Sequence, residues 1–361
     1  MDILIFGAGA VGSLLAFRLG AAGHRITAVG RAPFVRAVGQ RGLLVEHHGR
    51  AVRATRIRAV ERIELCGDTR FDLVLITTKA FDTATACAQV RSFVQRGAPA
   101  VVIQDGVGGI EAASKILGPH NLYAGVVTMP VEVLKPAVIS PQPGHGGLAF
   151  APVGPGRDLR PLVKLFAQAR FPVQACADWQ AMQWSRLMLS LIGNAIPAIL
   201  NRNAGQAYAD RSLVALECGA LREARSVVRR MRVKLIPLPG YPVPLLTWLL
   251  CALPSLSTHP LLSWLAEPGR AGKRPPLLLD LQRGRLQSEV EYLNGAVYRA
   301  GQKLGIPTPI NQVVYETLTG MAHNQLDWQA YQGQAERLVY RVTTKRLASR
   351  VRGWKSLRAG S

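Results

Sequence analysis

The chain has 361 residues, of which 48% are hydrophobic, and this length predicts two domains, each with its own buried core. Its five cysteines are scattered, which argues against a disulfide framework and favours a reducing compartment. The cysteines form no Cys-x-x-Cys pair and the seven histidines lack ligand spacing, so we expect no metal site. The formal net charge of +22 attracts anions, but the basic residues are spread along the chain without a nucleic-acid-binding module, so we expect no nucleic-acid partner.

The first 31 residues predict a βαβ unit. Residues 3–6 form a short apolar run bounded by glycine, which is typical of a central parallel strand covered on both faces. No basic segment precedes this run, so we expect a core strand rather than a secretory signal, and a cytoplasmic protein. Apolar residues at helical spacing then lead to Gly20, and residues 25–29 predict a second strand.

A glycine-rich loop joins the first strand to the first helix. It reads Gly7-Ala8-Gly9-Ala10-Val11-Gly12, which is the G-x-G-x-x-G pattern of dinucleotide-binding proteins. Gly7 permits the tight turn, Gly9 lets a pyrophosphate approach the backbone, and Gly12 allows close packing of the helix. Because the helix N-terminus attracts the anion, we expect all six residues to bind a dinucleotide cofactor.

The residue at the end of the second strand bears on the choice of nicotinamide cofactor. An NAD enzyme usually has Asp or Glu there, which accepts a hydrogen bond from the ribose 2′-hydroxyl. Here the strand ends Val29-Gly30-Arg31, and a guanidinium suits a 2′-phosphate. We therefore expect NADP(H), with Arg31 in its binding site; the alternative is that Arg31 is an ordinary surface arginine.

The strand–helix alternation continues to about Val127. Residues 72–76 and 100–103 are predicted as buried strands, with a crossover helix at about 83–93 between them. Residues 136–151 are rich in proline and glycine and predict an antiparallel extension or edge, before a helix near 159–169. The fold class is therefore an α/β Rossmann-like doubly wound sheet, in a domain spanning residues 1–177.

The remaining chain predicts an all-α C-terminal domain at residues 178–325. Residues 181–200, 213–231 and 284–304 carry helical periodicity. An apolar insertion at about 236–272 is broken by prolines, which favours short helices forming a lid or subunit interface over a membrane span. Residues 326–361 form a basic tail, either solvated and partly frayed or in contact with an anionic surface.

Four further segments occur in order along the chain. With the glycine loop they resemble the ketopantoate reductase family, whose members reduce a 2-keto acid with NADPH on the pathway to pantothenate. The resemblance spans roughly residues 1–320, without the apolar insertion and the basic tail. It implies a Rossmann domain followed by a helical domain, with the active site in the cleft between them. The segments are Thr77-Thr78-Lys79-Ala80, Gln104-Asp105-Gly106-Val107-Gly108, residues 184–194 and residues 288–295.

The resemblance assigns roles to individual residues. Lys79 matches a lysine that contacts the cofactor, and Asp105 stands where the family has an asparagine against nicotinamide and substrate. Arg186 replaces the family's general acid, a lysine, and so would stabilise an alkoxide without readily donating a proton. Glu289 matches a glutamate that interacts with the cofactor and the catalytic lysine. We expect it to face inward on the helix at 284–304, beside Leu293 and paired with Arg186; the alternative is a pair with Arg285, four residues earlier on that helix.

The substrate contacts implied by the resemblance are partly altered. Arg186, Ser190 and Asn194 are spaced by four residues and predict a polar stripe on one helix, in which Ser190 and Asn194 bind substrate; the alternative is a helix-packing network. Ala204 stands where another asparagine is expected, and residues 274–276, Arg-Pro-Pro, replace a serine-containing segment.

Two functions remain from the sequence. The first is an NADPH-dependent reductase of a 2-keto acid or related carbonyl, with Arg186 and Glu289 as the catalytic residues and a small-molecule substrate. The second is a non-catalytic NADP(H)-binding sensor or scaffold that has lost its proton donor. A homodimer and a peripheral membrane contact through residues 241–266 and the basic tail are compatible with both.

Overall fold

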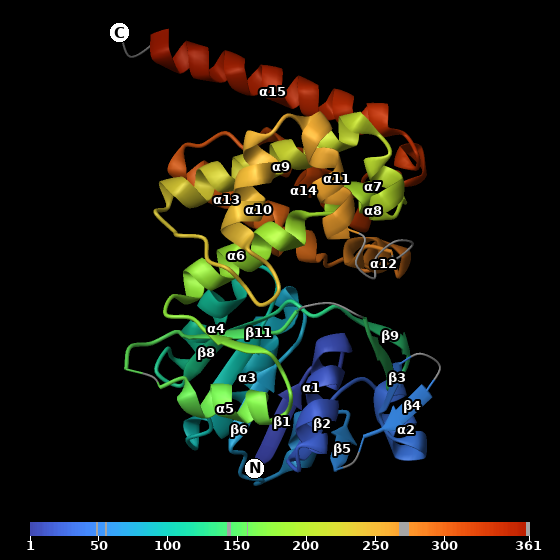
Figure 1. The fold of residues 1–361 in the computed structure, drawn as a ribbon, viewed down its shortest axis with the longest axis vertical. Helices are drawn as coiled ribbons and strands as arrows, with labels where there is room; N and C mark the ends of the chain where they lie inside the picture. Colours follow the sequence, from blue (N-terminus) through green and yellow to red (C-terminus); the bar gives the residue numbers. More distant parts are fainter. Residues whose placement is uncertain (48–49, 55, 143–145, 157, 267–273, 359–361) are drawn as a thin grey trace. The chain divides into compact units, whose positions relative to one another are not determined.

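A computed structural model describes residues 1–361 except 48–49, 55, 143–145, 157, 267–273 and 359–361. The chain forms two compact units (Figure 1), one made of Met1–Gln183 with Leu238–Tyr241 and the other of Trp184–Pro237 with Pro242–Ser361. Helix α6 (Trp179–Leu191) contributes to both units. We propose residue 178, immediately before α6, as the start of the helical domain.

The first unit contains an eight-stranded sheet in the order β12-β11-β8-β7-β6-β1-β2-β5. The strands from β8 to β5 are parallel, and the chain order reverses on either side of β1, as in a Rossmann fold. Strand β11 runs antiparallel to β8, which confirms the expected extension. The strands are β1 (Asp2–Phe6), β2 (Arg25–Val29), β5 (Ile57–Val60), β6 (Leu73–Ile76), β7 (Ala100–Ile103), β8 (Leu122–Val127), β11 (Leu148–Pro152) and β12 (Val173–Ala175).

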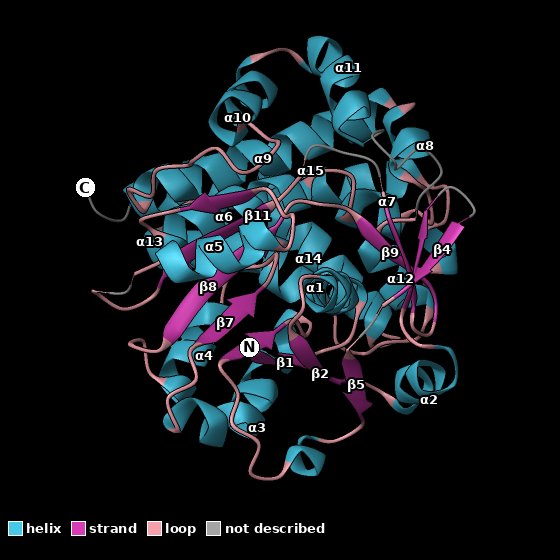
Figure 2. Ribbon diagram, turned by 60° about the horizontal axis from the view of Figure 1, so that its bottom comes forward, coloured by secondary structure: helices cyan, strands magenta, loops and turns pink. Residues whose placement is uncertain are grey.

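Helices cover both faces of this sheet (Figure 2). Helices α1 (Ala10–Ala21) and α5 (Arg160–Gln168) lie on one face, and α3 (Thr83–Gln95) and α4 (Gly109–Leu117) on the other. Helix α2 (Ala32–Arg41) follows β2. Because side chains alternate along a strand, Ile3 and Ile5 of β1 enter the core formed with α1 and α5. Both side chains are fully buried. The expected doubly wound arrangement is confirmed.

A second sheet has the order β4-β3-β10-β9 and lies in the first unit. Its residues Val45 and Ile139 join the same core as α1, so this sheet extends the hydrophobic interior. The strands are β3 (Leu44–His47), β4 (Arg50–Arg53), β9 (Val131–Lys135) and β10 (Val138–Pro141).

The second unit is helical, as expected, and α9 packs against six of its other helices within the described residues. The helix predicted at residues 213–231 is confirmed: it is α9 (Arg211–Arg230). The other helices are α7 (Ala195–Ile199), α8 (Ala204–Tyr208), α10 (Val243–Ala252), α11 (Ser255–Ala266), α12 (Pro276–Gln282), α13 (Asn294–Leu304), α14 (Pro309–Ala322) and α15 (Ala335–Arg358), with short 3₁₀ turns at η3 (Glu289–Tyr292) and η4 (Gln329–Tyr331).

Two of the predicted helices are interrupted. The helix expected at 181–200 ends at Leu191, because Gly193 adopts a left-handed conformation with φ 64° that terminates it. Pro197, which has no amide hydrogen, is compatible with the first turn of the new helix α7 but not with a continuous helix. The helix expected at 284–304 begins only at Asn294, after the 3₁₀ turn η3.

The apolar insertion folds as the expected short helices, α10 and α11. Proline at the first turn of α10 fits a helix start, whereas Pro260 lies inside α11. Among the described residues, no helix is both long enough and apolar enough to cross a membrane.

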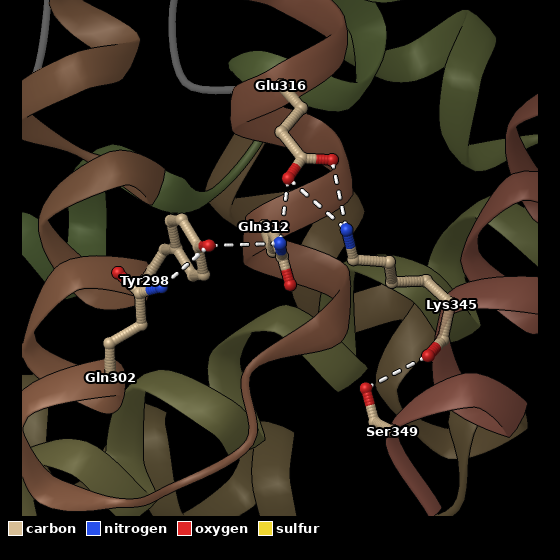
Figure 3. Close-up of polar contacts among 6 residues, drawn as sticks. All are labelled: Tyr298, Gln302, Gln312, Glu316, Lys345 and Ser349. Atoms are coloured by element: carbon tan, nitrogen blue, oxygen red, sulfur yellow. Dashed lines mark hydrogen bonds and ion pairs between the residues drawn. The ribbon is translucent and has the colours of Figure 1, made fainter. Parts of the chain in front are cut away.

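The basic C-terminal segment forms helix α15, and its part up to residue 349 is packed, so the expectation of a frayed tail is wrong for residues 335–349. Leu338 and Val342 of α15 are buried. The ammonium group of Lys345 lies 3.3 Å from both carboxylate oxygens of Glu316 on α14. Gln312 donates to Glu316 at 2.7 Å and to the hydroxyl of Tyr298 on α13 at 3.0 Å, so this polar network joins three helices (Figure 3).

Candidate functional site

The glycine loop has no room for side chains at two of its positions. Gly7 has φ 111°, and a β carbon there would lie 2.8 Å from the carbonyl carbon of Thr77. A β carbon at Gly12 would lie 2.2 Å from the carbonyl oxygen of Gly7, which is impossible without moving the backbone. At Gly9, by contrast, a β carbon would meet no heavy atom of the described residues within 4 Å. The fold therefore requires Gly7 and Gly12 and leaves open space above Gly9.

The N-terminus of α1 has the features of an anion-binding site. Its N-cap, Gly9, provides no side-chain hydrogen bond, and the first turn contains no acidic residue. The first amide to bond back within the helix is that of Ser13, which donates to the Gly9 carbonyl at 2.9 Å. The preceding helical amides have no acceptor in the helix, and the helix dipole places positive charge beside them. A cofactor pyrophosphate fits this loop.

Arg31 is positioned beside the glycine loop by the end of β2. The amide of Ala8 donates to the carbonyl of Val29 at 3.0 Å, and a β carbon at Gly30 would lie 2.9 Å from the β carbon of Ala8. Arg31 itself is exposed and is the N-cap of α2. Within the described part of the chain, no carboxylate pairs with its guanidinium. The strand end thus presents a cation and no acceptor for a ribose hydroxyl.

Lys79 and Asp105 follow the next two strands of the sheet. Lys79 is half-buried just beyond β6, where the hydroxyl of Thr77 donates to the carbonyl of Gly7 at 2.7 Å. Asp105 is exposed just beyond β7, and its neighbour Gln104 is buried and donates to the hydroxyl of Thr83. Because β1, β6 and β7 are parallel neighbours, these residues share the carboxyl edge of the sheet with the glycine loop.

The polar residues predicted on α6 do form a connected chain. The guanidinium of Arg186 donates to the hydroxyl of Ser190 at 2.7 Å, and this hydroxyl donates to the Arg186 carbonyl at 3.1 Å. The Asn194 amide donates to the Ser190 carbonyl at 3.2 Å. Asn194 is not part of the same helix, since it caps α7, so the single-helix stripe is corrected to a contact chain across the helix break.

Asn194 also fixes the start of another helix. Its side-chain oxygen accepts a hydrogen bond from the amide of Leu277, in the first turn of α12, at 3.3 Å. Both ends of this buried amide group therefore have partners within the helical unit. This observation favours the helix-packing alternative for Asn194. Ser190 is equally buried, whereas Arg186 is half-buried.

Glu289 lies in a different setting from the one expected. It begins the 3₁₀ turn η3 and is half-buried, whereas its neighbour Val290 is the fully buried residue of the turn. The expectation that Glu289 lies on one continuous helix with Leu293 is therefore wrong, whereas its pairing with Arg186 stays a prediction. Arg285, which offered a local partner for Glu289, has its guanidinium 2.8 Å from the carboxylate of Asp280.

The altered substrate positions are apolar in the structure. Ala204 is buried at the start of α8, beside Asn203, whose side chain caps that helix. Pro275 precedes α12 and Pro276 occupies its first turn, where the missing amide hydrogen is not needed. These replacements are locally compatible with the fold, and they remove polar groups that the family resemblance led us to expect.

A buried glutamate was missed from the sequence. The carboxylate of Glu217, on α9, accepts hydrogen bonds from the amide of Gly193 at 2.6 Å and the hydroxyl of Tyr208 at 3.1 Å. Burial raises the pKa of Glu217 to about 7, and both hydrogen bonds oppose this rise. Glu217 therefore holds the break between α6 and α7 that carries Asn194. The available signal was a lone acidic residue in the apolar segment 213–221.

The fold and the glycine loop define a Rossmann-type dinucleotide-binding protein with a helical second unit. Two family models match the chain: "Ketopantoate reductase PanE/ApbA" over residues 3–154 and "Ketopantoate reductase PanE/ApbA C terminal" over residues 178–322. The chain therefore belongs to the ketopantoate reductase family, whose members are NAD(P)-dependent oxidoreductases.

Individual relatives are distant but match over nearly their whole length. A 2-dehydropantoate 2-reductase of Caulobacter vibrioides is 27% identical over 327 residues, covering 89% of this chain and 99% of the relative. The structure of a ketopantoate reductase family protein from Ralstonia eutropha has a TM-score of 0.75 at 26% identity, over 90% of this chain and 99% of that one. D-Mandelate dehydrogenase, solved with NADH and anilino(oxo)acetate, has a TM-score of 0.76 at 19% identity over 90% and 99%, which shows a shared fold.

Proposed function

We propose that this protein is a cytoplasmic NADPH-dependent reductase of a 2-keto acid or related carbonyl compound. The observation that carries the cofactor assignment is Arg31, exposed at the end of β2 beside the glycine loop. A planar guanidinium can donate two parallel hydrogen bonds to a 2′-phosphate. The NADH-bound state of D-mandelate dehydrogenase shows that this fold also accommodates the cofactor without that phosphate, so the phosphate contact is the feature to test.

The cofactor-binding role extends over the carboxyl edge of the sheet. The six residues of the glycine loop hold the pyrophosphate, Lys79 adds positive charge, and Asp105 accepts hydrogen bonds near the nicotinamide. Bound NADPH would supply the hydride that adds to the substrate's carbonyl carbon. Because Asp105 is a carboxylate and not an amide, it repels an acidic substrate group unless a cation compensates. Any 2-keto acid, ketopantoate included, therefore needs a compensating cation in the site.

Arg186 carries the proposed electrostatic part of catalysis. Hydride addition turns the carbonyl oxygen into an alkoxide, which the guanidinium stabilises while Ser190 holds it in place at 2.7 Å. Arginine is not a ready proton donor, so water or another group protonates the alkoxide. Glu289 is proposed to interact with the cofactor and with the Arg186 guanidinium. Ser190 and Asn194 are the proposed substrate contacts.

The altered positions favour a more apolar substrate than the one the family is named for. Ala204 and Pro276 lack the side-chain hydrogen-bonding groups expected at their places. When a site has fewer polar groups, a substrate that lacks the matching hydroxyl groups leaves fewer of them unpaired, so little binding free energy is lost. We therefore place the substrate among 2-keto acids or related carbonyl compounds with an apolar substituent.

The test is turnover of a panel of 2-keto acids by the purified protein with NADPH, followed by loss of nucleotide absorbance. We expect oxidation of NADPH with at least one aliphatic or aromatic 2-keto acid, and a lower rate with ketopantoate. Arg186→Lys restores a group able to donate a proton and should raise kcat, whereas Arg186→Gln should lower it by about a hundredfold or more. Equal rates in all three proteins would contradict the role of Arg186.

A second candidate is a non-catalytic NADP(H)-binding sensor or scaffold. It is favoured by the replacement of the family's proton-donating lysine by Arg186. Tight binding of NADPH with no turnover of any panel member, and none after Arg186→Lys, would support this function over the reductase.

A further inference from the structure

The two helices of the apolar insertion expose large hydrophobic side chains. Leu245 and Trp248 on α10 are 54% and 52% exposed, and Trp264 on α11 is 56% exposed. We call these three residues the insertion surface. Figure 2 shows α10 and α11 close together beside α9, and both helices pack on α9.

The exposed residues are not part of a poorly packed core, because each helix has a different apolar side that is buried. On α10, Leu246 and Leu250 are buried, and on α11, Leu262 is fully buried. The helices thus already have an apolar side that packs on the unit. The insertion surface is a second apolar side, and large exposed apolar patches mark interaction sites in soluble proteins.

Positive charge borders this surface. Arg222, Arg225 and Arg229 follow one another at three- and four-residue spacing, so they form one stripe on α9. The guanidinium of Arg222 donates to the carbonyls of Cys251 and Leu253, at the end of α10, at 2.9 and 3.2 Å. Burial raises the pKa of Cys251 and the charges of Arg225 and Arg222 oppose this rise, which places Arg225 nearby as well.

The sequence around the surface is uniformly free of acidic residues. Residues 224–266 contain no Asp or Glu, whereas they contain five basic residues, Arg225, Arg229, Arg230, Arg232 and Lys234. A two-fold contact with a second copy would bring the same arginine stripe against itself, and like charges facing each other are unfavourable. The occupant that complements this surface is anionic with an apolar interior.

We propose that α10 and α11 dock the protein on an anionic lipid surface, with Trp248 and Trp264 at the headgroup level and Arg225 and Arg229 against lipid phosphates. Tryptophan prefers this interface because its ring is apolar and its N–H remains hydrated. The short, proline-broken helices lie on the membrane rather than cross it, in agreement with the absence of a spanning helix among the described residues. This surface does not depend on the reductase activity proposed above.

The experiment is co-sedimentation of the full chain with vesicles of phosphatidylcholine alone or mixed with phosphatidylglycerol, at low and high salt. We expect binding only to the anionic vesicles and loss of binding at high salt, because screening weakens the arginine contacts. The double variant Trp248→Ser/Trp264→Ser should reduce partitioning by about tenfold or more. Arg225→Gln/Arg229→Gln should reduce it by about fivefold for each charge removed.

A matched control separates this surface from the general positive charge of the protein. Arg62→Gln/Arg91→Gln removes the same charge from exposed positions of the first unit and should leave vesicle binding within about twofold of the wild type. NADPH affinity and the circular dichroism spectrum, measured for each variant, show that the fold is retained. Light scattering on the wild type and the tryptophan variant gives the oligomeric state.

Three outcomes would overturn the proposal. The first is absence of binding to anionic vesicles at low salt. The second is binding that the tryptophan variant retains or that the control variant loses equally. The third is a dimer that the tryptophan substitutions convert to a monomer, which would assign the surface to a second copy of the chain.

Discussion

The buried carboxyl of Glu217 makes a quantitative prediction about stability and pH. Its side chain is 2% exposed, and burial raises its pKa from 4.5 to about 7 in the folded protein. At intermediate pH the folded state therefore retains a proton that the unfolded state has released. The stabilising contribution of this proton is complete below the unfolded-state pKa of about 4.5 and is lost as pH rises toward 7.

The size of the effect follows from the shift. One pKa unit corresponds to about 1.4 kcal/mol, so a shift from 4.5 to about 7 gives a loss of about 3 kcal/mol across this range. In Glu217→Gln, the side-chain oxygen still accepts from Gly193 and Tyr208, but the group no longer ionises. The variant should therefore gain about 3 kcal/mol relative to the wild type between pH 4.5 and pH 8.

The assay is urea unfolding followed by circular dichroism at a series of pH values, with the transitions of the two units fitted separately. The matched control is Glu64→Gln, which makes the same substitution at a side chain that is 67% exposed and should change the unfolding free energy by less than about 1 kcal/mol. Parallel pH profiles for the wild type and Glu217→Gln would refute the reasoning, because they would show that Glu217 does not titrate differently in the folded state.

Three further predictions concern the glycine loop and the helical unit. Gly12→Ala should destabilise the first unit by about 1–3 kcal/mol and abolish NADPH binding, since its β carbon would lie 2.2 Å from the Gly7 carbonyl oxygen. The control Gly39→Ala should be tolerated, because its β carbon would meet nothing within 4 Å. Equal stability of the two variants in thermal unfolding would contradict the steric role of Gly12. Asn194→Ala leaves the buried amide of Leu277 without its acceptor and should cost about 1–3 kcal/mol in urea unfolding; an unchanged unfolding free energy would disprove the capping role. Lys345→Gln removes a partly exposed ion pair and should change the unfolding free energy by less than about 1 kcal/mol, so a loss of the folded helical unit would argue against this assignment.

Local patterns predicted the parts of the fold that depend on neighbouring residues. The glycine loop could be read from its spacing because each glycine has a steric reason within one turn of chain, as the contacts of Gly7 and Gly12 show. The doubly wound sheet followed from apolar runs alternating with helical periodicity. The place of Arg31 beside the loop followed from the end of strand β2, while its contact with the cofactor stays a prediction.

Long-range contacts were not available from those patterns. The apolar periodicity of residues 181–200 continued through Gly193, although that glycine and Pro197 were the local signals of a break. The role of Glu217 depends on a hydrogen bond to a residue 24 positions away, which no periodicity indicates. Helix α15 was taken for a tail because its charge outweighed the few apolar residues, Leu338 and Val342, that pack it in place.

The central claim is that this member of the ketopantoate reductase family uses NADPH because of Arg31. The most direct measurement is the dissociation constant of NADPH and of NADH for the wild type, Arg31→Gln and the surface control Arg91→Gln, by nucleotide fluorescence. We expect Arg31→Gln to weaken NADPH binding by about tenfold or more, because a charge-assisted hydrogen bond is lost, and to leave NADH binding unchanged, with no effect in the control. Equal binding of the two nucleotides by the wild type, or an equal loss of both in Arg31→Gln, would contradict it.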